Sequence, residues 1–220
     1  MRWIAGLAVL LAGTAAMCVV VDRIAISVGE RIITESELEQ RIRLTAFQNR
    51  EKPDFSLASR QKTAQQLIDQ KLIEKEMDVG RYPRLDAEHR KTLLADFAKA
   101  DYKSNPAALA QALQSYELTA QELEDDLGRQ SDLLTFLNLR FRPAVQVTNE
   151  DVQKYFDTVV KGTGKAGQQA QTEALNEMRN DIEQKLTGER ANKELDLWLA
   201  DQRRRTRITY LETDLRETAK

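Results

Sequence analysis

The chain has 220 residues and a formal net charge of −2, and 41% of the residues are hydrophobic and 31% charged. The hydrophobic share is too high for a disordered chain, and the near-neutral charge gives no general attraction to nucleic acid or anionic lipid. A single Cys and a single His exclude a disulfide framework, a zinc ribbon and most His-based metal sites. Few Gly and Pro among many good helix formers predict a mainly α-helical protein of one domain or two small ones.

The N-terminal segment has the pattern of an export signal. Residues 3–21 carry no charge, follow Arg2 and become small at 13–16. A short basic start, an apolar middle and a small-residue end are typical of a secretory signal peptide, which we predict over residues 1–16. Two alternatives remain open: the uncharged stretch is just long enough for a membrane anchor, and Cys18 is a possible site of lipidation.

In the rest of the chain, apolar periodicity and capping residues predict an ordered series of elements. The predicted strands are 24–28, 31–33 and 207–211; the predicted helices run from Thr34 through Ala46, over 57–79, from Asp86 through Phe97, over 107–113, from Thr119 to about Arg142, from Thr148 through Phe156 and over 168–205. Glu37 and Glu122 stand where they would complete capping boxes with the threonines three residues before them. We expect the first and last strands to pair and so to tie the two chain ends together.

The composition also divides the chain. Residues 17–160 form the N-terminal part of one domain, and residues 161–167, with three glycines in seven residues, are predicted to be a flexible linker. Residues 168–211 supply a long closing helix and strand of the same domain. Residues 212–220 are predicted to be a polar tail that frays.

No motif predicts catalysis, a metal or a cofactor. Gly164 and Lys165 suggest a phosphate-binding loop, but Ala166 follows where that loop needs Ser or Thr, so a linker is the better interpretation. His89 has no second His or Cys at ligand spacing and is expected to be a solvated helix residue. The basic run 203–205 lies at the end of the last predicted helix. Its positive charges are expected to interact favourably with the helix dipole, or to contact an acidic partner or a membrane surface.

The apolar residues between Leu133 and Phe141 point in nearly all directions around the predicted helix, whereas a surface helix has one apolar stripe. This predicts a central helix, a groove for a partner, or both along different turns. The candidate substrate-binding residues are Phe97, Tyr102, Leu133, Phe136, Phe141, Tyr155 and Phe156. In contrast, Trp198 is expected to be a core residue near the paired strands.

Four segments carry a resemblance to a known family. Val21–Leu38 resembles the opening of mature SurA-like periplasmic chaperones, and Leu67–Ile73 resembles their second-helix segment. Val147–Phe156 is similar to the family's valine-threonine helix, and Trp198–Leu199 followed by Ile208 resembles its closing helix and strand. The order of the four segments is that of the family, and the resemblance covers nearly all of the chain between the first and last of them.

The resemblance has one large departure. In SurA, and in the related PrsA and PpiD foldases, parvulin-type prolyl isomerase domains lie between the valine-threonine helix and the closing helix, where this chain has only residues 161–167. A folded α/β domain does not fit in seven residues. The resemblance therefore implies a SurA-type helical chaperone domain without the isomerase.

The function that the resemblance implies is an exported, ATP-independent chaperone of the periplasm, which holds unfolded envelope or outer-membrane proteins in apolar grooves. It needs no nucleotide, cofactor, metal or nucleic acid. Two alternatives stay open: a prolyl cis-trans isomerase, named by its family, and an envelope scaffold or assembly protein that binds one folded partner.

Overall fold

The computed structural model describes residues 22–159 and 168–216. The predicted signal peptide, Cys18 and the predicted linker at 161–167 lie outside these residues. Over these residues the fold is mainly helical (74%), with seven α-helices and a small three-stranded antiparallel sheet, which confirms the prediction of a mainly α-helical protein with a small β element. The helices are α1 (Glu35–Asn49), α2 (Leu57–Val79), α3 (Ala87–Tyr102), α4 (Pro106–Ser115), α5 (Ala120–Arg140), α6 (Asn149–Val159) and α7 (Gln168–Arg205).

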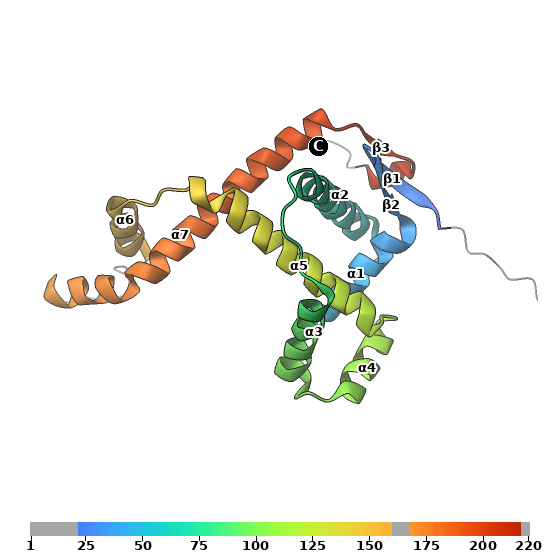
Figure 1. Ribbon diagram of the computed structural model, residues 1–220, viewed down its shortest axis with the longest axis horizontal. Coiled ribbons are helices and arrows are strands. Elements are labelled where there is room, and N and C mark those ends of the chain that lie inside the picture. Colours follow the sequence, from blue (N-terminus) through green and yellow to red (C-terminus); the bar gives the residue numbers. More distant parts are fainter. Residues whose placement is uncertain (1–21, 160–167, 217–220) are drawn as a thin grey trace, which may run out of the picture.

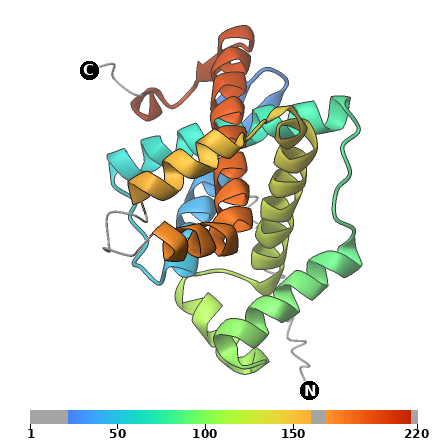
Figure 2. The ribbon, with the colours of Figure 1, turned by 90° about the vertical axis from the view of Figure 1, so that its left-hand side faces the viewer.

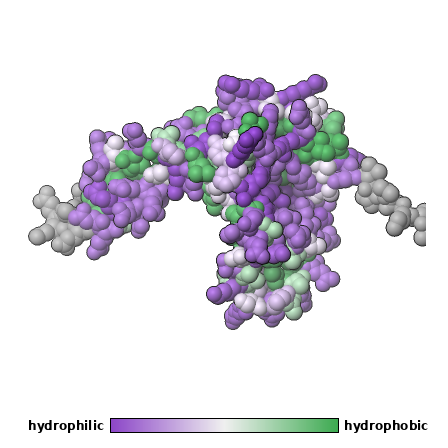
Figure 3. Space-filling model, viewed as in Figure 1, coloured by the Kyte–Doolittle hydropathy of each residue, from purple (hydrophilic) through white to green (hydrophobic). Residues whose placement is uncertain are grey.

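The sheet joins the two ends of the fold (Figure 1). Its strand order is β2-β1-β3, and the strands are β1 (Ile24–Val28), β2 (Arg31–Thr34) and β3 (Ile208–Tyr210). β3 pairs with β1 in antiparallel register, as predicted, with Ile26 opposite Tyr210. Hydrophobic residues gather at this end of the molecule in Figure 3. Within the sheet, Ile24 and Ile32 are 40% and 47% exposed.

Side-chain oxygens cap the helix starts at Thr34, Ser56, Asp86, Asn105, Thr119 and Thr148. The capping box predicted at Thr119 is present, because the Glu122 carboxylate accepts the backbone N–H of Thr119 at 2.6 Å. The box predicted at Thr34 is only half formed. Glu37 donates its N–H to Thr34 Oγ1, but its carboxylate accepts Lys71 Nζ at 2.7 Å from α2. The contact between α1 and α2 therefore uses the Glu37 carboxylate that the capping box would need.

Among the described residues, the buried apolar side chains form four small clusters. The first core packs the sheet on α1 and α2 and includes Leu215, which is fully buried. Leu215 lies in the short 3-10 helix η3 (Thr213–Leu215), and Gln61 of α2 binds the carbonyl oxygen of Asp214 at 2.8 Å. The prediction of a frayed tail is therefore wrong from residue 212 to 216, because one apolar side chain in a polar sequence anchors it; residues 217–220 lie outside the described structure.

The other three clusters form separate parts of the molecule. The second core joins α3, α4, the end of α1 and the start of α5 into a lobe. The third core lies where α2, α5, α7 and the 3-10 helix η1 (Arg142–Ala144) meet. The fourth core packs α6 on the first half of α7 alone, as an arm that leaves the body (Figures 1 and 2). The hydrophobic core is thus divided among the sheet region, the lobe, the junction of α2, α5 and α7, and the arm.

The contacts of α7 correct one expectation and add to another. Trp198 does not pack in the first core: its ring lies 5.7 Å from that of Phe136 and 6.2 Å from that of Phe141, in the third core. Leu199, one residue on, packs against both cores. Arg203 lies in the last turn of α7, as expected, and its guanidinium also binds Asp69 of α2 at 2.6 Å. The closing helix is thus held to the body by an aromatic cluster and an ion pair.

Within the described ranges, no helix is both long and apolar enough to cross a bilayer.

Candidate functional site

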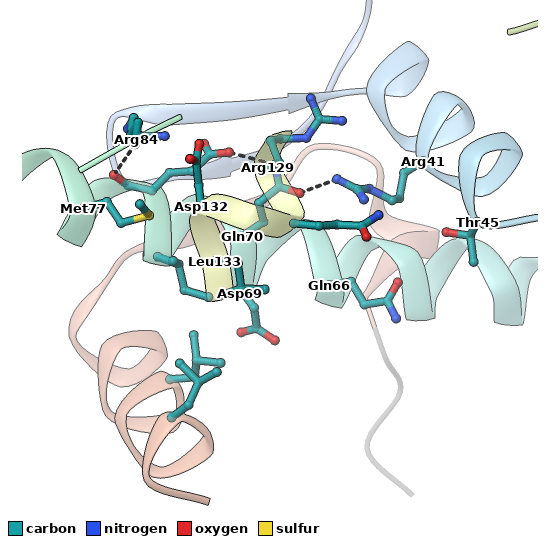
Figure 4. A pocket seen from close by; sticks show the side chains of 15 residues that line it. Arg41, Thr45, Gln66, Asp69, Gln70, Met77, Arg84, Arg129, Asp132 and Leu133 are labelled. Atoms are coloured by element: carbon teal, nitrogen blue, oxygen red, sulfur yellow. Dashed lines mark hydrogen bonds between the residues drawn. The ribbon is translucent and has the colours of Figure 1, made fainter. Parts of the chain in front are cut away.

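A groove of about 410 Å³ lies between α1, α2, α5 and α7. Apolar side chains gather towards one of its ends, beside the charged Arg84 and Asp132 (Figure 4). Met77 and Leu133 lie towards one end, and Arg41 and Thr45 lie towards the other. A site with an apolar end and a polar end can bind a ligand that has both characters.

The apolar end is formed by three helices. Ile73 and Met77, one turn apart on α2, are nearly buried and form its floor. Leu195 and Leu199 contribute from α7, one turn apart, and Leu133 from α5 is 38% exposed. Spacing of four residues on α2 and on α7 aligns these side chains along each helix. Leu133, Leu195 and Leu199 are at least partly exposed and leave a strip of apolar surface open to a ligand.

The polar end is organised around a buried carboxylate. Asp126 of α5 is fully buried, and its two oxygens accept four donors. Oδ1 binds Arg41 Nη1 at 2.7 Å and Arg129 Nη2 at 3.1 Å, and Oδ2 binds Gln48 and Gln130, both at 2.9 Å. A buried charge is tolerated only when it is paired and fully hydrogen-bonded. Asp126 meets both conditions and fastens α5 to α1.

The two arginines at this end are not equally satisfied. Burial lowers the pKa of Arg41, an effect that the neighbouring Asp126 opposes, and Arg41 also donates to Gln70 at 2.6 Å. Arg129 binds Asp126 through Nη2, but its buried Nε–H has no hydrogen-bond partner among the described residues. Two guanidinium groups therefore share one carboxylate, and one of them keeps an unused donor.

The other charged residues of the groove have their own partners. Asp132 accepts the N–H of Leu85 and the guanidinium of Arg90, both at 2.7 Å, and so holds the segment before α3 against α5. Asp69 binds Arg203, as described above. Arg84 binds Asp78 at 2.7 Å, and Glu74 accepts Gln70 at 2.7 Å. These ions hold helices and loops together around the groove.

The structure does not bring the seven predicted binding residues together. Only Leu133 lines the groove. Phe97 and Tyr102 pack around Phe47 in the second core, with ring centroids 6.0 and 6.5 Å from it. These two side chains are partly buried. They lie in the lobe, away from the groove.

The remaining four lie in two other cores. Phe136 is fully buried and Phe141 nearly so, 5.7 Å apart in the third core. Phe156 is buried in the fourth core, where Tyr155 lies under Lys185 Nζ at 5.1 Å. The expectation that Phe136 and Phe141 face a groove is therefore wrong for the described structure. Phe136 is central, as the first interpretation of this helix predicts, while Leu133, three residues before it, is exposed.

Sequence reasoning missed the polar end completely. Arg41, Asp126 and Arg129 come from two helices far apart in the chain, and each looks like an ordinary residue of a charged helix face. The only local signal is the spacing of three residues between Asp126 and Arg129, which is common in helices. His89 is exposed as expected, and it binds the Asp86 carboxylate at 2.8 Å. No group of His, Cys, Asp and Glu in the described ranges could hold a metal ion.

No known protein family model matches the chain, and no similar curated protein is found.

Proposed function

We propose that this protein is a non-catalytic, ATP-independent chaperone that is exported and binds unfolded segments of envelope proteins in the groove between α2, α5 and α7. The observation that carries the proposal is the apolar strip in that groove, where Leu133, Leu195 and Leu199 are at least partly exposed. Charged and polar side chains that are bound to one another surround this strip. Unfolded chains expose apolar residues between polar ones, so a groove with both characters suits them. Reversible affinity alone then holds and releases the client.

The order of the family-like segments supports the same proposal. β1, β2 and the start of α1 cover the segment that resembles the opening of SurA-like chaperones, and α6 covers the valine-threonine segment. The charged residues around the groove support a binding role, because Asp69, Asp132 and Arg84 hold structural partners. A general acid or base must instead be free to exchange a proton with a substrate.

Two neighbouring leucines on α5 provide the test. Leu133 lines the groove and is 38% exposed, while Leu134 points elsewhere and is 59% exposed. Leu133→Gln should weaken the binding of an unfolded outer-membrane β-barrel protein about tenfold, because an apolar contact of the groove is replaced by a polar one. Leu134→Gln is the matched control and should bind as the unmodified protein does. Light scattering of the aggregating client, with and without each variant, measures the effect.

The outcomes separate the proposal from its alternatives. If both variants suppress client aggregation equally, the client does not bind in the groove. Binding of a folded protein, with no suppression of aggregation, would favour a scaffold. Faster cis-trans isomerisation of a proline peptide would favour the isomerase. The result that supports the chaperone is suppression that depends on Leu133, without any change in the isomerisation rate.

A further inference from the structure

We infer that the groove selects unfolded segments in which an apolar side chain and a carboxylate side chain stand two residues apart in an extended chain. This inference rests on the proposed function and names the class of client segment that the same groove binds. Three features of the site carry it: an unbalanced positive charge, an unused donor, and the spacing between the apolar and the cationic side chain.

The charge at the polar end is unbalanced by one. Arg41 and Arg129 both bind Asp126 Oδ1. The neighbouring carboxylates do not correct this, because each has a cation of its own. Asp69 is bound by Arg203 and Asp132 by Arg90. Glu74 is bound by Arg31 and Glu37 by Lys71. Two like charges that share one carboxylate repel each other, and an incoming carboxylate relieves that repulsion. An anion is therefore the complementary group for this end of the groove.

Arg129 is the residue that can bind the anion. Its side chain is 31% exposed, whereas that of Arg41 is 18% exposed. The Nε–H of Arg129 is buried and has no partner in the described part of the chain, and an unsatisfied buried donor is unfavourable. When the guanidinium turns toward a carboxylate, Nε and one Nη can donate to its two oxygens together, which is the strongest geometry for this pair.

The distance along α5 sets the spacing in the ligand. Leu133 at the apolar end and Arg129 at the polar end are four residues apart on one helix, which is about 6 Å along the axis. An extended chain advances about 6.6 Å over two residues, and those two side chains point to the same side. A segment that lays an apolar side chain on Leu133 thus brings the side chain two positions away to Arg129.

The occupant is a peptide and not a polyanion. The groove has one unbalanced cation beside an apolar strip, and the whole chain has a net charge of −2. A polyphosphate backbone needs several cations in a row. One carboxylate beside an apolar residue matches both ends of the groove.

Three fluorescent peptides test the inference. They are acetylated and amidated, so that a side chain is the only anion, and they carry Leu-x-Glu, Leu-x-Gln or Leu-Glu-x in the same neutral sequence. We expect the first to bind about tenfold tighter than the other two at low salt, and to lose this advantage in 1 M salt. Fluorescence anisotropy with the full chain gives each Kd.

Arg129→Gln should bind the Leu-x-Glu and Leu-x-Gln peptides equally, because the cation is gone. Asp126 keeps Arg41, Gln48 and Gln130, so this variant should fold, which a thermal melt checks. The matched control is Arg204→Gln: Arg204 is 73% exposed on α7 and pairs with Asp201, and its loss should leave the preference unchanged. If Arg129→Gln has a clearly lower Tm than the unmodified protein, the Kd values of the three peptides with the unmodified protein test the inference on their own.

The failures are distinguishable. If all three peptides bind equally, the inference is overturned while the proposed function stands. If Leu-Glu-x binds as well as Leu-x-Glu, the spacing argument is overturned. If none of the peptides binds, the proposed function fails as well.

Discussion

Replacing Phe136 by Ala tests where the core of this protein ends and its binding surface begins. Phe136 is fully buried, and its ring lies 5.0 Å from that of Tyr82 and 5.7 Å from those of Phe141 and Trp198. Truncating a buried Phe removes its apolar burial and leaves a cavity, which costs about 3–5 kcal/mol. Because aromatic neighbours add to the loss, we expect a decrease of about 4–5 kcal/mol in the free energy of unfolding.

That loss is large compared with the total stability of about 5–15 kcal/mol for a typical domain. For a chain of this length it corresponds to a decrease in Tm of about 8–20 °C. Urea unfolding followed by circular dichroism gives the free energy, and calorimetry gives Tm. Leu134→Ala on the same helix, where the side chain is 59% exposed, is the control and should change the stability by less than about 0.5 kcal/mol.

One result would refute this reasoning. If Phe136→Ala keeps the Tm of the unmodified protein but abolishes client binding, then Phe136 contacts the client and the third core opens to receive it. A lower slope of free energy against urea, with a normal Tm, would show that the third core unfolds separately from the others.

Three further expectations follow from local contacts. Gly188→Ala should raise stability by about 0.5–1 kcal/mol, because Ala is the better helix former and a Cβ at Gly188 would meet nothing within 4 Å; thermal melts measure this. Gly128→Ala should lower stability in the same assay, because its Cβ would lie 2.2 Å from Arg90 Nη1, and Arg90 is held by a buried carboxylate. Asp151 has its pKa lowered by hydrogen bonds from Arg190 and from a threonine at the start of α6, so its contribution to stability is present above the ordinary Asp pKa of about 3.9 and is lost as the pH falls through the lower folded value. NMR titration of its carboxyl should show this low pKa, and Arg190→Gln should bring it back towards the ordinary value.

The sequence predicted the secondary structure well wherever the signal was local. The cap at Thr119 and the proline at the first position of α4 mark helix starts through contacts within four residues. The end of α2 at Val79 is also where the pattern predicts it, although Arg81, not Gly80, has the left-handed backbone. The first and last strands were also expected to pair, and β1 and β3 do so.

Tertiary contacts were the part that could not be read from the sequence. The burial of Phe136 and the exposure of Leu133 depend on which face of α5 meets α7, and both residues are apolar, so the pattern does not distinguish them. The convergence of Arg41 and Arg129 on Asp126 depends on the crossing of α1 and α5. With 68 charged side chains in Lys, Arg, Asp and Glu (33 basic plus 35 acidic), no spacing rule selects these three.

Because the first core closes around Leu215 and β3, the order of folding cannot follow the order of synthesis. Chains emerge from the N-terminus at about 5–20 residues per second, and β1 is made long before its partner β3. The second core needs nothing beyond α5, so it can form while the last third of the chain is still being made. The apolar strand β1 has one open edge throughout this interval, which is when an unpaired strand is most prone to aggregate. A protein that we propose to hold unfolded chains is thus exposed to the same hazard until its last residues are made.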